Sequence, residues 1–228
     1  VGGGHMTPAA GAFQIFAHGD RLLYNAEYVF KETAFYNAAL VNGQGQLGSG
    51  GDWFECTEFR RRKRGPRLSS VKEQGDATVV ACDVAPAYPD PLGVKRHDRH
   101  FIYLRPDIWV LIDEFATQRA STFEILFHAY GEPAAADRPF TPCGPGVWET
   151  GGAQGRLRVT GLTPALQGAA ELQDIWRTGL KDDGTHPGYQ MCLLRLKNAV
   201  PVRRFTSVVT LEAFPAGGAA TAAAAWDG

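Results

Sequence analysis

Apolar and polar side chains alternate through much of this chain, and the alternation predicts strands. Two such runs, 94–104 and 108–115, are separated by Arg105-Pro106-Asp107, a sequence typical of a tight turn. We therefore expect a β-hairpin there. Its second half, 109–115, is the most apolar stretch of the chain and is expected at the centre of a sheet.

A second turn signal lies near the N-terminus. The apolar residues 38–41 run into Asn42-Gly43, a pair that tolerates the positive φ of a type I′ turn. Residues 29–40 can also carry strand, and a short helix competes with strand only at 164–172. Loops are expected at 85–93 and 131–155. Further strands are expected at 12–17, 21–24, 53–59, 121–130, 156–160, 173–178, 190–197 and 203–214, with two more in 68–84 on either side of Gly75-Asp76.

Composition agrees with an all-β protein. The chain has 228 residues with 27 glycines and 14 prolines, which favour many short strands joined by turns. No internal repeat indicates a propeller or solenoid. We predict a large antiparallel β-sandwich of two packed sheets with about a dozen or more strands. We expect a cloning remnant at 1–6, a single sandwich domain at 7–215 and a low-complexity tail at 216–228.

Charge and cysteine content exclude several classes of function. The net charge is −1, so no basic field would hold nucleic acid, and no apolar run reaches the ~20 residues of a membrane helix. The four cysteines lack zinc-finger spacing, and the sequence leaves open whether any form disulfides. They are Cys56, Cys82, Cys143 and Cys192.

The strongest local charge is a basic run at 60–67, with six basic side chains in eight residues. Guanidinium groups match the geometry of sulfate and carboxylate, so Arg60, Arg62 and Arg64 are candidates for binding an acidic polysaccharide. The commoner role of such a run is a solvated edge that discourages strand pairing. Both interpretations stay open at this point.

The histidines and tyrosines give weaker signals. His97 and His100 are an odd number of residues apart, so on one strand they face opposite sides of the sheet, and binding one ligand together would require a bulge. His128 lies in an apolar run and is expected to be a core histidine bonded to backbone. Tyr28 and Tyr36, with Asn25, surround the hairpin expected at Asn42-Gly43, and the two tyrosines are the polar aromatics closest to it. A tyrosine can act as a general acid or base if its pKa is lowered, but most strand tyrosines are packing residues with a polar tip.

Several segments together resemble the heparinase II/III-like family of polysaccharide lyases, in the β-sandwich domain that follows that family's helical toroid. The resemblance covers about 12–130 and is carried by a series of segments, none of which is specific by itself. They are Phe13-Gln14-Ile15-Phe16, Gly19-Asp20-Arg21-Leu22-Leu23, Asn25-Ala26-Glu27-Tyr28, the stretch 36–46, Gly75-Asp76-Ala77, Ala87-Tyr88, the stretch 99–107, Val110-Leu111-Ile112-Asp113-Glu114 and the strand ending at His128.

This resemblance implies cleavage of acidic, uronic-acid polysaccharides by β-elimination, in the periplasm or outside the cell. In such a reaction a base removes the C5 proton of the uronic acid while an acid assists the leaving oxygen. The implied partners are an acidic polysaccharide and an N-terminal helical toroid domain, with neither nucleic acid nor membrane. Asn25, Tyr28, Tyr36, Arg60, Arg62 and Arg64 would then contact substrate.

The chain departs from the family where a metal is expected. The family carries a His-x-His segment before the first strand, an Asp where Asn25 stands and a His where Tyr36 stands, which together can hold zinc. Residues 7–10 contain no histidine, and an amide and a phenol are poor zinc ligands. We therefore predict no metal or other cofactor, no catalytic residue in this chain, and activity only in a longer parent lyase. The alternative is a carbohydrate-binding or scaffolding sandwich that has lost lyase chemistry.

Overall fold

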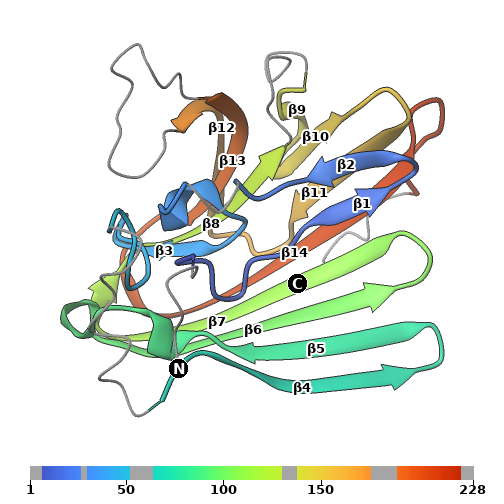
Figure 1. The fold of residues 1–228 in the computed structure, drawn as a ribbon. Helices are drawn as coiled ribbons and strands as arrows, with labels where there is room; N and C mark the ends of the chain where they lie inside the picture. Colours follow the sequence, from blue (N-terminus) through green and yellow to red (C-terminus); the bar gives the residue numbers. More distant parts are fainter. Residues whose placement is uncertain (1–6, 27–29, 52–63, 130–137, 176–188, 222–228) are drawn as a thin grey trace.

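The computed structural model describes residues 7–26, 30–51, 64–129, 138–175 and 189–221. Within them the chain forms a predominantly antiparallel β structure with a large sheet packed against a smaller one (Figure 1). Three single-turn 3₁₀ helices connect the strands: η1 (Thr33–Phe35), η2 (Ala85–Ala87) and η3 (Asp90–Leu92). The predicted all-β sandwich is confirmed.

The large sheet has eight antiparallel strands. In spatial order they are β4 (Arg67–Gln74), β5 (Ala77–Asp83), β6 (Val94–Leu104), β7 (Ile108–Ser121), β14 (Val202–Pro215), β11 (Gly155–Gly161), β10 (Val147–Gly151) and β9 (Thr141–Gly144). The expected hairpin is β6–β7, and β7 lies in the interior of the sheet, as its apolar sequence predicted.

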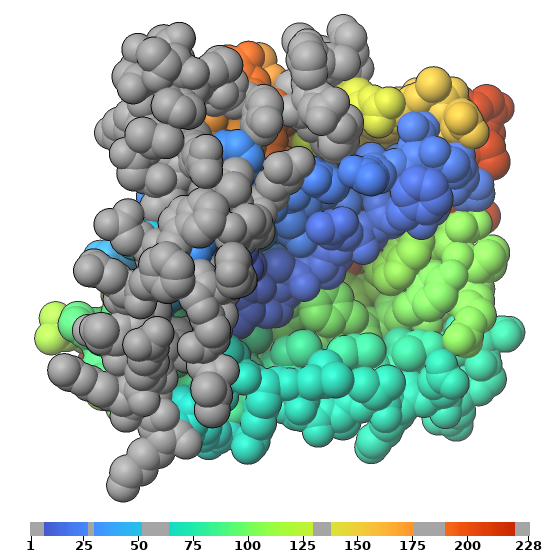
Figure 2. Space-filling model, viewed as in Figure 1, coloured from blue at the N-terminus to red at the C-terminus, as the bar shows by residue number. Residues whose placement is uncertain are grey.

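The small sheet has four strands, and a separate hairpin lies beside it. The order is β12 (Leu166–Ile175), β13 (Tyr189–Asn198), β8 (Phe123–Ala129) and β3 (Ala39–Val41), and the hairpin pairs β1 (Ile15–Ala17) with β2 (Asp20–Leu23). This hairpin lies against the β10–β11 part of the large sheet (Figure 1), and the blue residues form a ridge next to the green strands in Figure 2.

The main core lies between the sheets. Every second residue of each strand points inward, so Leu111 and Val209 from the large sheet meet Phe127 and Leu194 from the small one, all with at most 1% of their surface exposed. Ile15 and the other inward residues of the first hairpin join the same cluster. Burial of these side chains provides most of the stabilisation of the sandwich.

The segment that follows the first hairpin covers the outer face of the small sheet. Leu126 and Leu193 point away from the main core, yet both are fully buried against Leu40 and the partly buried Ala34. Asn37 anchors this cover: its side-chain oxygen accepts from the backbone N–H of His128 at 2.6 Å, and its amide donates to the carbonyls of Phe13 and Tyr24.

A buried polar cluster ties the same N-terminal part to the large sheet. Arg99 donates to both carboxylate oxygens of Asp113, at 2.7 and 3.0 Å, and also to the carbonyls of Gly11 and Asn37. His97 lies with Nε2 2.8 Å from Asp113 Oδ1. All three side chains are completely buried.

The structure corrects three expectations. Residues 131–155 are not loop throughout, because β9 and β10 form within them, and Gly146 adopts the positive φ of their turn. The helical alternative at 164–172 is wrong, since β12 pairs along its length with β13. Strand at 29–40 is largely wrong: η1 occupies its middle and only the last two residues belong to β3.

The Asn-Gly turn is confirmed in geometry. Asn42 and Gly43 have φ of 53° and 72°, and Val41 and Gln44 form an isolated bridge across them. No return strand follows among the described residues up to 51. The expected strand at 53–59 lies outside the described residues.

Candidate anion-binding groove

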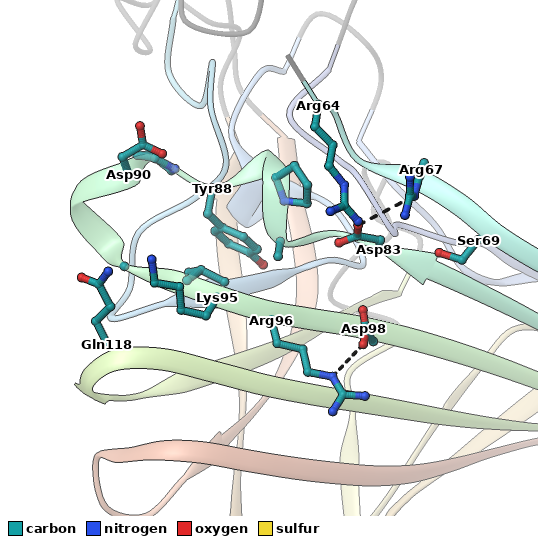
Figure 3. Close-up of a pocket in the computed structure, with 15 residues that line it drawn as sticks. Arg64, Arg67, Ser69, Asp83, Tyr88, Asp90, Lys95, Arg96, Asp98 and Gln118 are labelled. Atoms are coloured by element: carbon teal, nitrogen blue, oxygen red, sulfur yellow. Dashed lines mark hydrogen bonds and ion pairs between the residues drawn. The ribbon is translucent and has the colours of Figure 1, made fainter. Parts of the chain in front are cut away.

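A charged groove of about 620 Å³ opens at one end of β4, β5 and β6, beside the 3₁₀ turns η2 and η3 (Figure 3). These three strands, Gln118 of β7 and the proline-rich connection 85–93 therefore contribute to one surface. Its lining includes four basic and three acidic side chains: Arg64, Arg67, Lys95 and Arg96, and Asp83, Asp90 and Asp98.

Two strand irregularities shape this groove. The register of β4 against β5 shifts between Leu68 and Ser70, and that of β6 against β7 shifts between Val94 and Arg96. Each shift leaves one extra residue, Ser69 in the first case and Lys95 in the second, and both line the groove. Bulges redirect side chains and occur often next to functional sites. The sheet is therefore irregular at the place where charges gather.

The arginines of the groove are held by carboxylates. Arg64 and Asp83 are joined by a hydrogen-bonded ion pair, while Arg67 Nε lies 3.9 Å from the same carboxylate, a looser contact. Arg96 donates from Nε to Asp98 at 2.6 Å. Figure 3 shows these pairs on the wall of the groove. Such contacts orient guanidinium groups without neutralising the site completely.

Below the groove lies the buried polar cluster. Tyr88 lines the groove, but its hydroxyl points inward, donating to the carbonyl of Ala39 at 2.9 Å and lying 3.1 Å from His97 Nδ1. Burial raises the pKa of Tyr88 and lowers the pKa of His97. Burial would also raise the pKa of Asp113, but the charge of Arg99 and the contact with His97 hold it at about 2.

The side chains that line this groove can bind a ligand through charge and hydrogen bonds. Guanidinium and ammonium groups attract anions, and the aspartates can accept hydrogen bonds from hydroxyl groups. The Tyr88 hydroxyl is directed into the protein with a raised pKa, so it is unsuited to accept a proton from a bound molecule.

Only part of the predicted site comes together here. Arg64 lies in the groove, whereas Asn25 and Tyr36 lie near the small sheet, away from it. Arg60, Arg62 and Tyr28 fall outside the described residues. The substrate contacts of all six residues stay predictions.

Asn25 and Tyr36 have internal partners. The amide of Asn25 donates to Phe13 and its oxygen accepts from the backbone of Asn37 at 2.7 Å. Tyr36 is 3% exposed, its hydroxyl donates to the carbonyl of Phe30 at 2.7 Å, and burial raises its pKa. These bonded groups do not fit a zinc site, and in the described residues no three His, Cys, Asp or Glu side chains gather in a way that could hold a metal ion.

Sequence reasoning missed Lys95 and Arg96 as site residues, and it placed Arg67 only within a basic run. The pattern of 94–104 reads as a regular strand, so nothing in it indicates an extra residue at Lys95. Arg67 is brought beside Asp83 by the pairing of β4 with β5, which depends on register rather than on local sequence.

The histidines and cysteines lie as follows. His97 is buried while His100 is partly exposed, which confirms that they face opposite sides of β6. His128 is buried with Nε2 2.9 Å from the carbonyl of Ala34, which confirms a core histidine bonded to backbone. Burial lowers its pKa to about 4, although contacts with Gln173 and Ala34 oppose the shift. Of the cysteines in the described residues, Cys82 and Cys143 are free thiols and Cys192 is buried in the main core, while Cys56 lies outside them.

The fold and groove define a large antiparallel β-sandwich with a mixed-charge groove at one end of its large sheet. The sequence matches the family described as heparinase II/III-like, C-terminal, over residues 1–137. The chain therefore belongs to this family. No curated protein sequence matches it significantly.

Solved structures support the same fold. A heparan sulfate lyase HepC from Pedobacter heparinus is similar with a TM-score of 0.65 and 11% identity, over 94% of this chain and 32% of that protein. A heparinase III is similar with a TM-score of 0.62 and 15% identity, over 93% of this chain and 30% of that protein. The chain thus spans about a third of the length of these proteins. Among the described residues, no helix has the length and apolar character needed to cross a bilayer.

Proposed function

We propose that this chain is the β-sandwich part of a polysaccharide lyase that cleaves acidic, uronic-acid polysaccharides by β-elimination. Its role is to hold anionic groups of the substrate in the groove, while an N-terminal helical toroid outside this chain provides the acid and base. Membership of the heparinase II/III-like family supports this assignment. So does a length of about a third of the heparan sulfate lyase and the heparinase III that share its fold, which leaves room for a further domain.

One observation carries the binding role: four basic side chains from two strands and the segment before β4 line a single groove, together with three aspartates, on a chain whose net charge is −1. The formal charge of the groove is therefore slightly positive, and Arg67 and Lys95 are the basic side chains that no close ion pair engages among the described residues. Arginine and lysine side chains recognise carboxylate or sulfate in this way. Such a substrate would be met in the periplasm or outside the cell.

Two measurements test the proposal. The longer protein should release products with the absorbance of an unsaturated uronate when it is incubated with a panel of uronic-acid polymers. The 228-residue chain should bind the cleaved polymer, and Arg67→Ala should weaken that binding. Lack of product across a broad panel would overturn the lyase assignment. Undiminished binding by Arg67→Ala would overturn the role of the groove.

A second candidate is a carbohydrate-binding or scaffolding sandwich without lyase chemistry. It is favoured by the internal hydrogen bonds of Asn25 and Tyr36, which stand where the family carries metal-binding side chains. Under this alternative the chain binds glycans on an array, whereas the longer protein releases no unsaturated product. The product assay therefore separates the two candidates.

A further inference from the structure

Three carboxylates form a row across adjacent strands beside the groove. Asp83 in β5 is the register partner of Asp98 in β6, and Asp98 is the register partner of Glu114 in β7. Direct cross-strand partners lie about 4.5–5.5 Å apart, and like charges at that distance are unfavourable. Asp83 and Asp98 also line the groove itself. We call these three residues the carboxylate row.

Arginine side chains offset the repulsion between the three carboxylates. Arg96 bridges two of its members, with Nε 2.6 Å from Asp98 and Nη2 2.5 Å from Glu114. Arg64 pairs with Asp83 at the other end. These guanidinium groups therefore already have anionic partners before any ligand arrives, and a bound anion would compete with the row for them.

Two cations remain more available to a ligand. Arg67 makes only the 3.9 Å contact with Asp83, and its side chain is 60% exposed. Lys95, the extra residue of the β6 bulge, is exposed and has no ion pair among the described residues. The groove thus offers an anionic ligand two cations without a close ion pair among the described residues, next to carboxylates that can accept hydroxyl donors.

We propose that the carboxylate row sets the charge density of the polysaccharide that the groove accepts. It selects chains with one carboxylate per sugar and disfavours densely sulfated chains. A uronate carboxylate contacts Lys95 or Arg67, while neighbouring hydroxyls donate to Asp83 or Asp98. Additional sulfates on the same sugars would lie against the row, where their charge is repelled. This inference rests on the proposed function and specifies its substrate class.

Size-matched hexasaccharides test the selectivity in the 228-residue chain. The probes are oligomannuronate, with one carboxylate per sugar and no sulfate, and a heparin hexasaccharide, measured by calorimetry at the same ionic strength. We expect oligomannuronate to bind at least about tenfold more tightly. Asp83→Asn and Glu114→Gln should each reduce this preference by about five- to tenfold, mainly through tighter binding of heparin. Glu114 does not line the groove, so its variant tests charge rather than direct contact.

The control is Asp76→Asn, which removes the same charge in the exposed β4–β5 turn, away from the groove. It should leave the preference unchanged. The inference is overturned if the wild-type chain binds heparin as tightly as oligomannuronate, if it binds neither, or if Asp76→Asn acts like Asp83→Asn. Release of unsaturated product by the longer protein is a separate measurement, so the lyase assignment survives each of these results.

Discussion

Arg99 and Asp113 are register partners on β6 and β7, and they form a two-pronged ion pair with no exposed surface. Removing one member would leave the other buried without its countercharge. Asp113→Asn should therefore lower the free energy of unfolding by about 3–5 kcal/mol, measured by urea denaturation. In the double variant Arg99→Met/Asp113→Leu, the decrease in the free energy of unfolding should be smaller than the sum of the decreases caused by Arg99→Met and Asp113→Leu separately. A cost below about 1 kcal/mol for Asp113→Asn would contradict this role.

Asn37 is the second buried polar residue that joins distant segments. Asn37→Ala would remove the side-chain partner of the His128 backbone N–H and of the Tyr24 carbonyl, whereas the Phe13 carbonyl keeps its bond from Asn25. Each buried group that loses its bond costs about 1–3 kcal/mol, so we expect the free energy of unfolding to fall by roughly 2 kcal/mol or more in chemical denaturation. Gln44→Ala, at an exposed position of the same segment, is the control and should change little. Equal effects of the two variants would refute the anchoring role.

His128 makes stability depend on pH. In the unfolded chain its imidazole is protonated below about 6.5, whereas in the folded protein the pKa is about 4. Protonation therefore favours the unfolded chain below pH 6.5. The free energy of unfolding is unaffected by His128 above pH 6.5 and falls by about 3 kcal/mol as the pH falls from 6.5 to 4. His97 shifts stability in the same direction, because burial lowers its pKa as well.

Urea denaturation at a series of pH values checks this dependence. His128→Gln should flatten the curve between pH 6.5 and 4, leaving the slope that His97 contributes. His100→Gln, at a partly exposed position, should leave the curve as in the wild type. A wild-type curve that is flat over this interval would count against the buried, neutral state of His128.

Much of the large sheet could be predicted because its strands carry strong local signals. The β6–β7 hairpin has alternating residues on both sides of Arg105-Pro106-Asp107, and the structure places its first strand and turn as expected. Strands β9 and β10 were missed because their segment contains prolines and glycines, which read as loop. Strand β12 lies at the edge of its sheet with most of its side chains exposed, so it lacks the alternation that distinguishes a strand from a helix.

The groove could be predicted only in part. Arg64 and Arg67 belong to a basic run visible in the sequence, but the run does not indicate which strand lies beside it. The bulge at Lys95 and the alignment of Asp83 with Asp98 are properties of register, which tertiary pairing fixes. Local sequence therefore identified some of the cations but neither their carboxylate partners nor the surface they share.

A close contact between the two sheets gives a prediction about packing. Gly168 in β12 lies against Trp148 of β10, and a Cβ at this position would be 2.0 Å from Cζ2 of the indole. Trp148 is 8% exposed and has little room to move. Gly168→Ala should therefore destabilise the protein by about 1–3 kcal/mol, measured as a lower thermal midpoint. Gly144→Ala, where a Cβ meets nothing within 4 Å, is the control. If both variants melt at the same temperature, the two sheets are less tightly packed than described.

Lys95 connects the shape of β6 to ligand binding. Lys95 is the extra residue of a bulge, so its side chain lines the groove while the rest of β6 keeps the alternating pattern of a strand. Lys95→Ala should weaken binding of oligomannuronate about three- to fivefold, the effect of losing one exposed ion pair, whereas Lys95→Arg should retain most of it. Lys72→Ala removes the same charge from the exposed part of β4 outside the groove, and calorimetry should show no change. Equal weakening by Lys72→Ala would mean that overall charge, rather than this groove, attracts the polysaccharide.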